Sequence, residues 1–204
     1  MKIDPKEVHG RNLHHLLMSI IAPRPIAWVS TVSEGGIYNL APFSAYCVMS
    51  VRPAIVGFDS APFRDGKKKD TLLNIQATGE YVINVVNEAL AMEMNVTAAA
   101  FPPEVDEFKE AGLTPVKADL VKAPMVSESP VSMECRLNQI LKFGEEPMTN
   151  NFIIGEILRI HIKDELYADD EIQVSEWKPI GRLGGRGGDQ YCRTTDRFEM
   201  KRPG

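Results

Sequence analysis

Small polar side chains gather around a Gly-Gly turn near the N-terminus. Residues 23–44 read PRPIAWVSTVSEGGIYNLAPFS, which predicts a strand, a turn at Gly35–Gly36 and the start of a second strand. The strands beside this turn carry hydroxyl, amide and small residues, namely Ser30, Thr31, Ser33, Asn39, Ala41, Pro42 and Ser44. A strand that only fills a core does not need this chemistry, which favours a ligand site. Serine and threonine also mark strand ends and turns, so a purely structural interpretation stays open.

A second candidate group precedes a predicted helix. The sequence LLNIQATG predicts a helix that ends at Gly79, with Asp70 as its N-cap. Lys67–Lys69 stand just before this helix and Thr71 lies in its first turn, so cations, a hydroxyl and free backbone N–H groups meet at the positive end of the helix dipole. This is the chemistry of a phosphate site. Lysine runs are also common in solvated loops, and Asp70 could serve only as the cap.

The C-terminal segment combines glycine, arginine and tyrosine. Residues 178–197 read KPIGRLGGRGGDQYCRTTDR, with five glycines in eight residues. No strand-to-helix GxGxxG unit surrounds these glycines, which argues against a Rossmann site. The segment is either a flexible tail or a flap that closes over a bound ligand through its cationic and aromatic side chains, Arg182, Arg186, Tyr191 and Arg193.

No catalytic side chain or metal site can be assigned. The sequence shows no Ser-His-Asp or Cys-His arrangement and no isolated carboxylate pair. His14 and His15 are adjacent, so on a helix they project roughly 100° apart, which is poor geometry for one metal ion. Cys47, Cys135 and Cys192 are odd in number and lack a CxxC pair, which indicates reduced thiols rather than a disulfide framework or a structural zinc site.

Hydrophobic periodicity predicts many short strands with a few helices between them. Strands are expected over 43–51, 54–60, 80–87, 131–138 and 157–163, and helices over 4–21, 71–78, 88–101 and 105–112. Three strands in close succession near the N-terminus suggest an antiparallel meander. In the later strands, alternation places Cys135 on the buried face and His161 on the solvent face. The fold class is therefore β-rich α+β, a single domain over 1–204 that can close into a small barrel.

Composition excludes several classes of function. The 204 residues are 44% apolar and 25% charged, with a formal net charge of −5. This balance argues against a general nucleic-acid binder, which needs a basic excess to neutralise phosphates. No apolar run reaches the roughly 18 residues that a membrane helix needs, and the start MKIDP is unlike a signal peptide. A cytoplasmic location is expected, without a nucleic-acid or membrane partner.

Seven motifs in order resemble one known family. They are PRPIAWVST, NLAPFS, KDT before a helix, EYVINVV, DEFKEAGLT, SPVSMECRL and GRLGG, and they span nearly the whole chain. Together they resemble the flavin reductase-like, FMN-binding split-barrel family, and within it the flavoredoxin-type branch. The resemblance implies a six-stranded antiparallel Greek-key barrel with peripheral helices, a homodimer, and non-covalent FMN near the dimer interface.

The resemblance also implies a set of FMN-binding positions. Those matching the isoalloxazine and ribityl site are Trp28, Ser30, Thr31, Asn39, Leu40, Ala41 and Ser44, and those matching the phosphate side are Lys69, Asp70 and Thr71. Arg182 and the turn Gly184–Gly185 would approach the cofactor or the partner subunit. A tyrosine is expected soon after these glycines, but here RGGDQ intervenes before Tyr191, which leaves the role of Tyr191 open.

The implied activity is that of an oxidoreductase in which FMN accepts hydride from NAD(P)H and passes electrons to free flavin, oxygen or a protein acceptor. No nicotinamide-binding fold is visible, so NAD(P)H would have to stack on the exposed flavin face. The alternative is a flavoredoxin-like FMN electron carrier that a protein partner reduces, without nicotinamide activity. A dimeric scaffold that binds no flavin is a third possibility.

Overall fold

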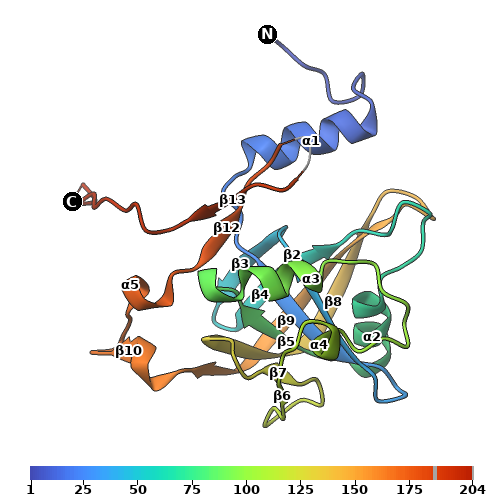
Figure 1. The fold of residues 1–204 in the computed structure, drawn as a ribbon. Helices are drawn as coiled ribbons and strands as arrows, with labels where there is room; N and C mark the ends of the chain where they lie inside the picture. The colour runs from blue at the N-terminus through green and yellow to red at the C-terminus, as the bar shows by residue number, and fades with distance from the viewer. Residues whose placement is uncertain (186–187, 204) are drawn as a thin grey trace.

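The main sheet curls into a barrel of antiparallel strands. The computed structural model describes residues 1–185 and 188–203, and Figure 1 shows their arrangement. The sheet has seven strands in the order β2-β1-β5-β8-β9-β4-β3, with each neighbouring pair antiparallel. Their bounds are β1 Ala27–Val32, β2 Tyr38–Phe43, β3 Tyr46–Val51, β4 Ala54–Ser60, β5 Glu80–Val85, β8 Val131–Phe143 and β9 Asn150–Ile162.

The two edge strands of this sheet are joined by only two residues. Strands β2 and β3 lie at opposite ends of the strand order, yet Ser44 and Ala45 alone connect them. Because two residues span only about 7 Å, the two edges must approach each other there. The predicted meander of three consecutive strands is therefore wrong, since β2 pairs with β1 whereas β3 pairs with β4. The break at Ser44–Ala45 also gives seven strands where the resemblance implied six.

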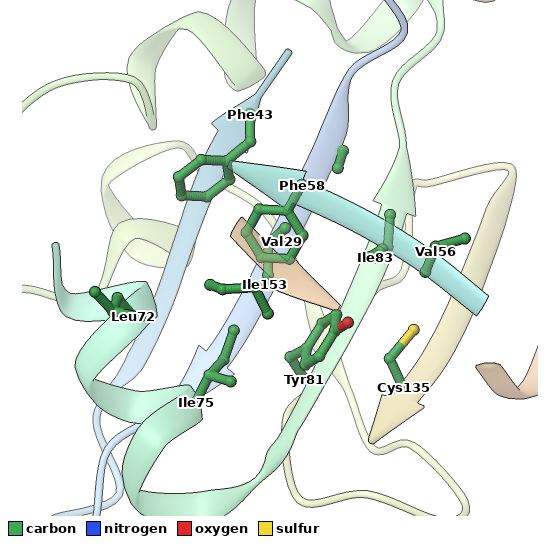
Figure 2. Close-up of a cluster of buried hydrophobic side chains, with 11 residues drawn as sticks. Val29, Phe43, Val56, Phe58, Leu72, Ile75, Tyr81, Ile83, Cys135 and Ile153 are labelled. Carbon is green, nitrogen blue, oxygen red and sulfur yellow. The ribbon is translucent and has the colours of Figure 1, made fainter. Parts of the chain in front are cut away.

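Both faces of β1 are covered, because its alternating side chains enter two different cores. Val29 points into the barrel, where it packs with Phe43, Phe58 and Tyr81 (Figure 2). Trp28 points outward into a second core with Leu40, Leu90, Met94 and Phe108. All six residues of β1 are therefore buried. A third, smaller core contains Val82, Ala118, Val121 and Ala123.

The helices lie outside the barrel. They are α1 Gly10–Ile20, α2 Asp70–Thr78, α3 Ala91–Val96, α4 Glu107–Glu110 and α5 Val174–Trp177, with single 3-10 turns at Glu88–Leu90 and Asp164–Leu166. Helix α2 ends as predicted at Gly79, whose φ of 71° is left-handed. The prediction that Asp70 is the N-cap is wrong, since Lys69 occupies that position and Asp70 is the first helical residue. None of the described helices is long and apolar enough to cross a bilayer.

Two predicted helices are shorter than expected. Helix α1 starts at Gly10 rather than near residue 4. The helix predicted over 88–101 consists of a 3-10 turn followed by α3, because the Asn87 side chain accepts a hydrogen bond from Leu90 N and starts the chain in a tight turn. Ala98 lies beyond the end of α3 and is exposed.

Short strand pairs complete the fold. They are β6 Pro115–Val116 with β7 Met125–Val126, β10 Tyr167–Ala168 with β11 Glu171–Ile172, and β12 Ile180–Arg182 with β13 Tyr191–Arg193. The β12–β13 pair reaches α1, and Arg182 forms a bridge with Arg24 just after that helix, so segments from the first and last parts of the sequence lie side by side (Figure 1). The long β8–β9 hairpin extends five residues beyond the predicted end of its first strand.

Candidate functional site

The side chain of Asn39 joins four elements. It lies directly opposite Thr31 in the β1–β2 register and is 7% exposed. Its Oδ1 accepts hydrogen bonds from Thr71 Oγ1 at 2.7 Å and from Thr31 Oγ1 at 3.3 Å. Its Nδ2 donates to Glu107 Oε1 at 2.8 Å. Residues far apart in sequence, on β1, β2, α2 and α4, are therefore held in one buried polar network.

Glu107 is a member of this network that sequence reasoning missed. It is 5% exposed, and its Oε2 accepts a hydrogen bond from the backbone N–H of Leu40 at 3.2 Å. Burial raises the pKa of Glu107 to about 7, and the nearby charge of Asp70 raises it further, whereas hydrogen bonds from backbone amides and from Asn39 lower it. The carboxyl thus changes its charge near neutral pH. The only signal in the sequence was its place in the motif DEFKEAGLT.

A small hollow lies beside the start of α2, and we call it the α2 hollow. Its volume is about 60 Å³, room for roughly four waters or one compact anionic group. Five predicted site residues line it, together with Glu107, Pro42, Phe63, Thr97, Ala98, Ala99 and Phe101; the five are Asn39, Ala41, Lys69, Asp70 and Thr71. Lys69 Nζ lies 4.7 Å from the ring centroid of Phe63, which holds the ammonium at the rim.

Three charged groups in the α2 hollow are partly desolvated. Burial lowers the pKa of Lys69. Burial raises the pKa of Asp70, and the charge of Glu104 adds to that rise. With one lysine and two carboxyl groups, Asp70 and Glu107, the hollow suits an anion best when the carboxyls carry protons. The raised pKa values of Asp70 and Glu107 run in that direction, whereas the lowered pKa of Lys69 runs against it.

A much larger hollow adjoins the first, and we call it the α1 hollow. Its volume is about 990 Å³, and it shares Pro42 and Ala98 with the α2 hollow. Its walls come from α1, from the end of β2, from residues 61–64, from α3 and from the C-terminal turn. Two further predicted residues, Ser44 and Arg182, line it. Seven of the eleven predicted positions thus surround two adjoining hollows.

The other four predicted positions line neither hollow. Trp28, Ser30, Thr31 and Leu40 each expose none of their surface. Trp28 Nε1 donates to Thr97 Oγ1 at 2.8 Å, so this tryptophan supports a residue that lines the α2 hollow. A side chain without exposed surface cannot touch a ligand in this conformation. Thr31 and Leu40 support the site through Asn39 and Glu107, whereas the Ser30 hydroxyl donates to the carbonyl of Pro124, which lines neither hollow. Direct contact of these four residues with FMN stays a prediction.

Arg24, which the sequence reasoning did not select, ties α1 to the rest of the molecule. It is 7% exposed, and its guanidinium donates to the carbonyls of Met18, Ile21 and Leu183 and, through Nε, to Ser44 Oγ at 3.4 Å. Helix α1 itself buries no side chain. The only signal in the sequence was the arginine between two prolines in PRPIAWVST.

Replacing Arg24 by alanine is expected to release α1 while the barrel stays folded. Four hydrogen bonds from one guanidinium hold segments that pack few apolar side chains, and regions of that kind open at low free energy. Hydrogen exchange of residues 10–20 should accelerate at least tenfold, with β5 and β8 unchanged. Arg11→Ala is the matched control, because Arg11 lines the same hollow without a hydrogen bond to its side chain in the described structure. Equal protection in both variants would contradict this role.

The C-terminal turn packs closely on α1. Arg182 and Arg24 exchange backbone hydrogen bonds at 2.8 and 2.9 Å. A Cβ atom on Gly184 would lie 2.3 Å from the Cα of Ser19, so only glycine fits there. Tyr191 pairs with Arg182 in the β12–β13 hairpin, and the guanidinium carbon of Arg182 lies 4.6 Å from the centroid of the Tyr191 ring. Tyr191 therefore contacts a residue of the α1 hollow, although RGGDQ separates it from the glycines.

The remaining members of the predicted flap do not join the site. Arg193 pairs instead with Glu88, with Nε and Oε1 2.5 Å apart. Arg186 lies outside the described residues. The flap hypothesis thus rests on Arg182 and Tyr191.

A second polar cluster lies on strands β8 and β9. His161 was predicted to face solvent, but its Nε2 lies 2.6 Å from Oε1 of the fully buried Glu134. Asp119 completes a group of possible metal ligands. Both Glu134 oxygens also accept hydrogen bonds from backbone N–H groups of residues 119–121, so this carboxylate holds a loop in place.

Cys135 is buried as predicted, and all three cysteines are free thiols.

Comparison with known proteins identifies the family. A model of the flavin reductase-like domain matches residues 18–175, so the chain belongs to the flavin reductase-like family. An uncharacterised protein of Aquifex aeolicus is 38% identical over 91% of this chain and 93% of its own length. The structure of nitrilotriacetate monooxygenase component B from Bacillus cereus is 31% identical, with a TM-score of 0.92 over 98% of both chains.

The flavoredoxin-type resemblance is confirmed at the level of the fold. Flavoredoxin of Desulfovibrio vulgaris (Miyazaki F) superimposes with a TM-score of 0.74 and 21% identity, covering 87% of this chain and 90% of that one. This protein is therefore a flavin reductase-like split barrel.

Proposed function

We propose that this protein is an FMN-dependent oxidoreductase that accepts hydride from NAD(P)H and passes electrons to free flavin or another acceptor. The observation that carries the proposal is the pair of adjoining hollows, around which seven predicted FMN-binding positions from three separate segments converge. Family membership supports flavin as the ligand. We also propose that residues 1–204 form one domain.

The residues of the two hollows fit FMN in different ways. The α2 hollow offers Lys69 and the first turn of α2, whose leading N–H groups have no partner inside the helix, and this suits a phosphate. The α1 hollow offers the apolar side chains of Phe43 and Met94 beside the hydroxyl of Ser44, and this suits a flat ring with a polar edge. Pro42, common to both hollows, would lie along the connecting ribityl chain.

FMN, when bound, supplies the transfer of a hydride, two electrons with one hydrogen nucleus, that no side chain can perform. The chain supplies orientation and electrostatics. Ser44 and Arg182 place a hydroxyl and a cation in the α1 hollow, where they can stabilise negative charge on a ring edge. The barrel core behind β2 excludes water from the rear of the site.

The visible spectrum of the purified protein is the first test. Flavin bands should accompany the protein through gel filtration, and anaerobic mixing with NADH or NADPH should bleach them. A colourless protein that takes up no added FMN would leave only the scaffold hypothesis. Bound FMN that stays oxidised for minutes with both dinucleotides would favour the flavoredoxin-like carrier, whose fold this chain shares.

A homodimer is part of the proposal. Helix α1 leaves Leu17, Ile20 and Ile21 at least 39% exposed, and β3 leaves Val48 and Val51 more than two-thirds exposed. Apolar side chains gathered in this way mark interaction surfaces. Light scattering coupled to gel filtration should therefore give twice the mass of one chain.

Lys69→Ala is expected to weaken FMN binding by about 1.5–3 kcal/mol, the contribution of a charge-assisted hydrogen bond. Thr71→Ala should also weaken it, because the Thr71 hydroxyl holds Asn39. Equilibrium dialysis of FMN measures both effects. Lys67→Ala is the matched control, since the Lys67 side chain is 81% exposed and does not line either hollow. Unchanged FMN affinity in Lys69→Ala and Thr71→Ala would refute the phosphate assignment.

A further inference from the structure

The α1 hollow is strongly cationic in a protein of net charge −5. Four arginines and two histidines line it, and no carboxylate stands among its described lining residues; the six are Arg11, His14, His15, Arg24, Arg64 and Arg182. In the described part of the chain, none of the four arginines forms an ion pair. The positive charge there is uncompensated.

The arginines of this lining repel one another. Burial lowers the pKa of Arg24, and the charge of Arg182 lowers it further. Burial lowers the pKa of His14 too, and the charges of His15 and Arg24 add to that effect. Like charges held together are unfavourable, and an anion that enters between them recovers this free energy. The hollow is therefore suited to a ligand with more than one negative charge.

The walls and the position of the hollow narrow the class of ligand. Met18, Ile26 and Met94 add apolar surface to the cationic lining, and about 990 Å³ exceeds what a single flavin ring requires. The α2 hollow, where we place the FMN phosphate, adjoins it and shares Pro42 and Ala98 with it. A ligand here would carry a flat ring and several phosphates, and would reach the flavin.

We propose that the α1 hollow binds the phosphates of the nicotinamide dinucleotide that reduces FMN, and that its arginines select NADPH over NADH. In Rossmann folds, an acidic side chain holds the ribose 2′-hydroxyl of NAD, whereas a nearby arginine accommodates the 2′-phosphate of NADP. This chain has a different fold, but the same charge complementarity between arginine and a phosphate applies. The described lining contains arginines and lacks an acid. The inference rests on the proposed function and names NADPH as the hydride donor.

Arg11 and Arg64 are the residues that carry the selection. Both are exposed, and neither side chain has a hydrogen-bond partner in the described structure, so both are available to a ligand. Arg24 is already engaged in holding α1. Variants of Arg11 and Arg64 therefore test binding without disturbing that anchor.

Calorimetric titration of FMN-loaded protein with NADP⁺ and NAD⁺, which leave the flavin oxidised, tests the proposal. NADP⁺ should bind about tenfold more tightly than NAD⁺, as one further charge-assisted contact allows, and its affinity should fall as salt increases. Arg11→Ala and Arg64→Ala should each weaken NADP⁺ binding about tenfold and NAD⁺ binding less. Lys117→Ala, an exposed cation away from the hollow, should change neither.

The other outcomes separate this inference from the proposed function. A protein that does not retain FMN overturns the proposed function. Retained FMN with equal affinity for the two dinucleotides, or with no NADP⁺ binding, overturns this inference alone. Loss of FMN from the Arg11 and Arg64 variants would assign the arginines to the flavin phosphate, and a changed oligomeric state at unchanged NADP⁺ affinity would assign the hollow to a second copy. Both results contradict the proposal.

Discussion

Asn39→Ala is expected to lower the free energy of unfolding by about 3 kcal/mol and to abolish FMN retention. The substitution removes the donor to Glu107 and the acceptor for Thr71 and Thr31, and so leaves a carboxylate and hydroxyls short of partners in a buried site. Buried groups left in this way cost about 1–3 kcal/mol each, and more when charged. Urea unfolding followed by circular dichroism measures the loss of stability.

The matched control for this variant is Asn138→Ala, because Asn138 is an exposed asparagine on β8 without a hydrogen bond to its side chain in the described structure. It should change stability by less than about 0.5 kcal/mol, as surface substitutions usually do. A loss below 1 kcal/mol in Asn39→Ala would contradict the role of Asn39 as the centre of the network. Asn39→Asp adds a carboxyl beside Glu107, and this variant should regain stability as the pH falls, because two adjacent carboxyls tolerate only one charge.

Glu107 is expected to make FMN binding weaken as the pH rises through 7. An anion placed in the α2 hollow, which Glu107 lines, raises the pKa of this carboxyl above its value of about 7 in the free protein. FMN binding then takes up a proton. The affinity for FMN falls about tenfold for each unit by which bound FMN raises the pKa of Glu107. We expect a rise of about one unit, and therefore a loss of affinity of about tenfold between pH 6.5 and 9. Fluorescence titration of FMN at successive pH values measures this change.

Glu107→Gln isolates this effect from the other groups that titrate. The FMN phosphate ionises near pH 6 and strengthens binding as the pH rises, while Lys69 loses its charge at high pH; both remain in the variant. The glutamine side chain keeps the shape but cannot ionise. The pH dependence above 7 should therefore be flatter in Glu107→Gln than in the unsubstituted protein, and identical profiles would contradict the assignment.

Glu107 should also make the free energy of unfolding fall as the pH rises. The folded pKa of about 7 exceeds the ordinary value of 4.5, so between these two values the folded protein holds a proton that the unfolded chain has released. The contribution of Glu107 to folding is complete below pH 4.5 and is lost as the pH rises to 7. Glu107→Gln should remove this slope.

Local residue patterns predicted several of the strands, turns and helix ends. Alternation predicted the β8 and β9 strands, and Gly79 ended α2 because only a residue tolerant of positive φ fits the left-handed C-cap. The turn at Gly35–Gly36 was equally readable, since Gly36 adopts a φ of 83°. The Asp70 cap failed because a residue of capping type at a helix start can equally be its first helical residue, and only backbone geometry distinguishes the two.

The burial of charged and polar groups depended on long-range packing. Glu107 lies 68 residues from Asn39 in sequence, and Arg24 lies 159 residues from Leu183, so no local pattern could have paired them. For the same reason the strand pattern did not reveal that both faces of β1 are covered, so that Trp28, Ser30 and Thr31 expose no surface.

The sequence by itself determined that polar residues around one Gly-Gly turn, a lysine before a helix and a glycine-rich tail belong to a flavin reductase-like chain. Only the tertiary structure decided which of them share a space. It brought Asn39, Thr71 and Glu107 into one network, and placed four arginines around a hollow without an acid among its described lining residues. The physical reason is that hydrogen bonds and charges act over a few ångströms in space, whatever the separation along the chain.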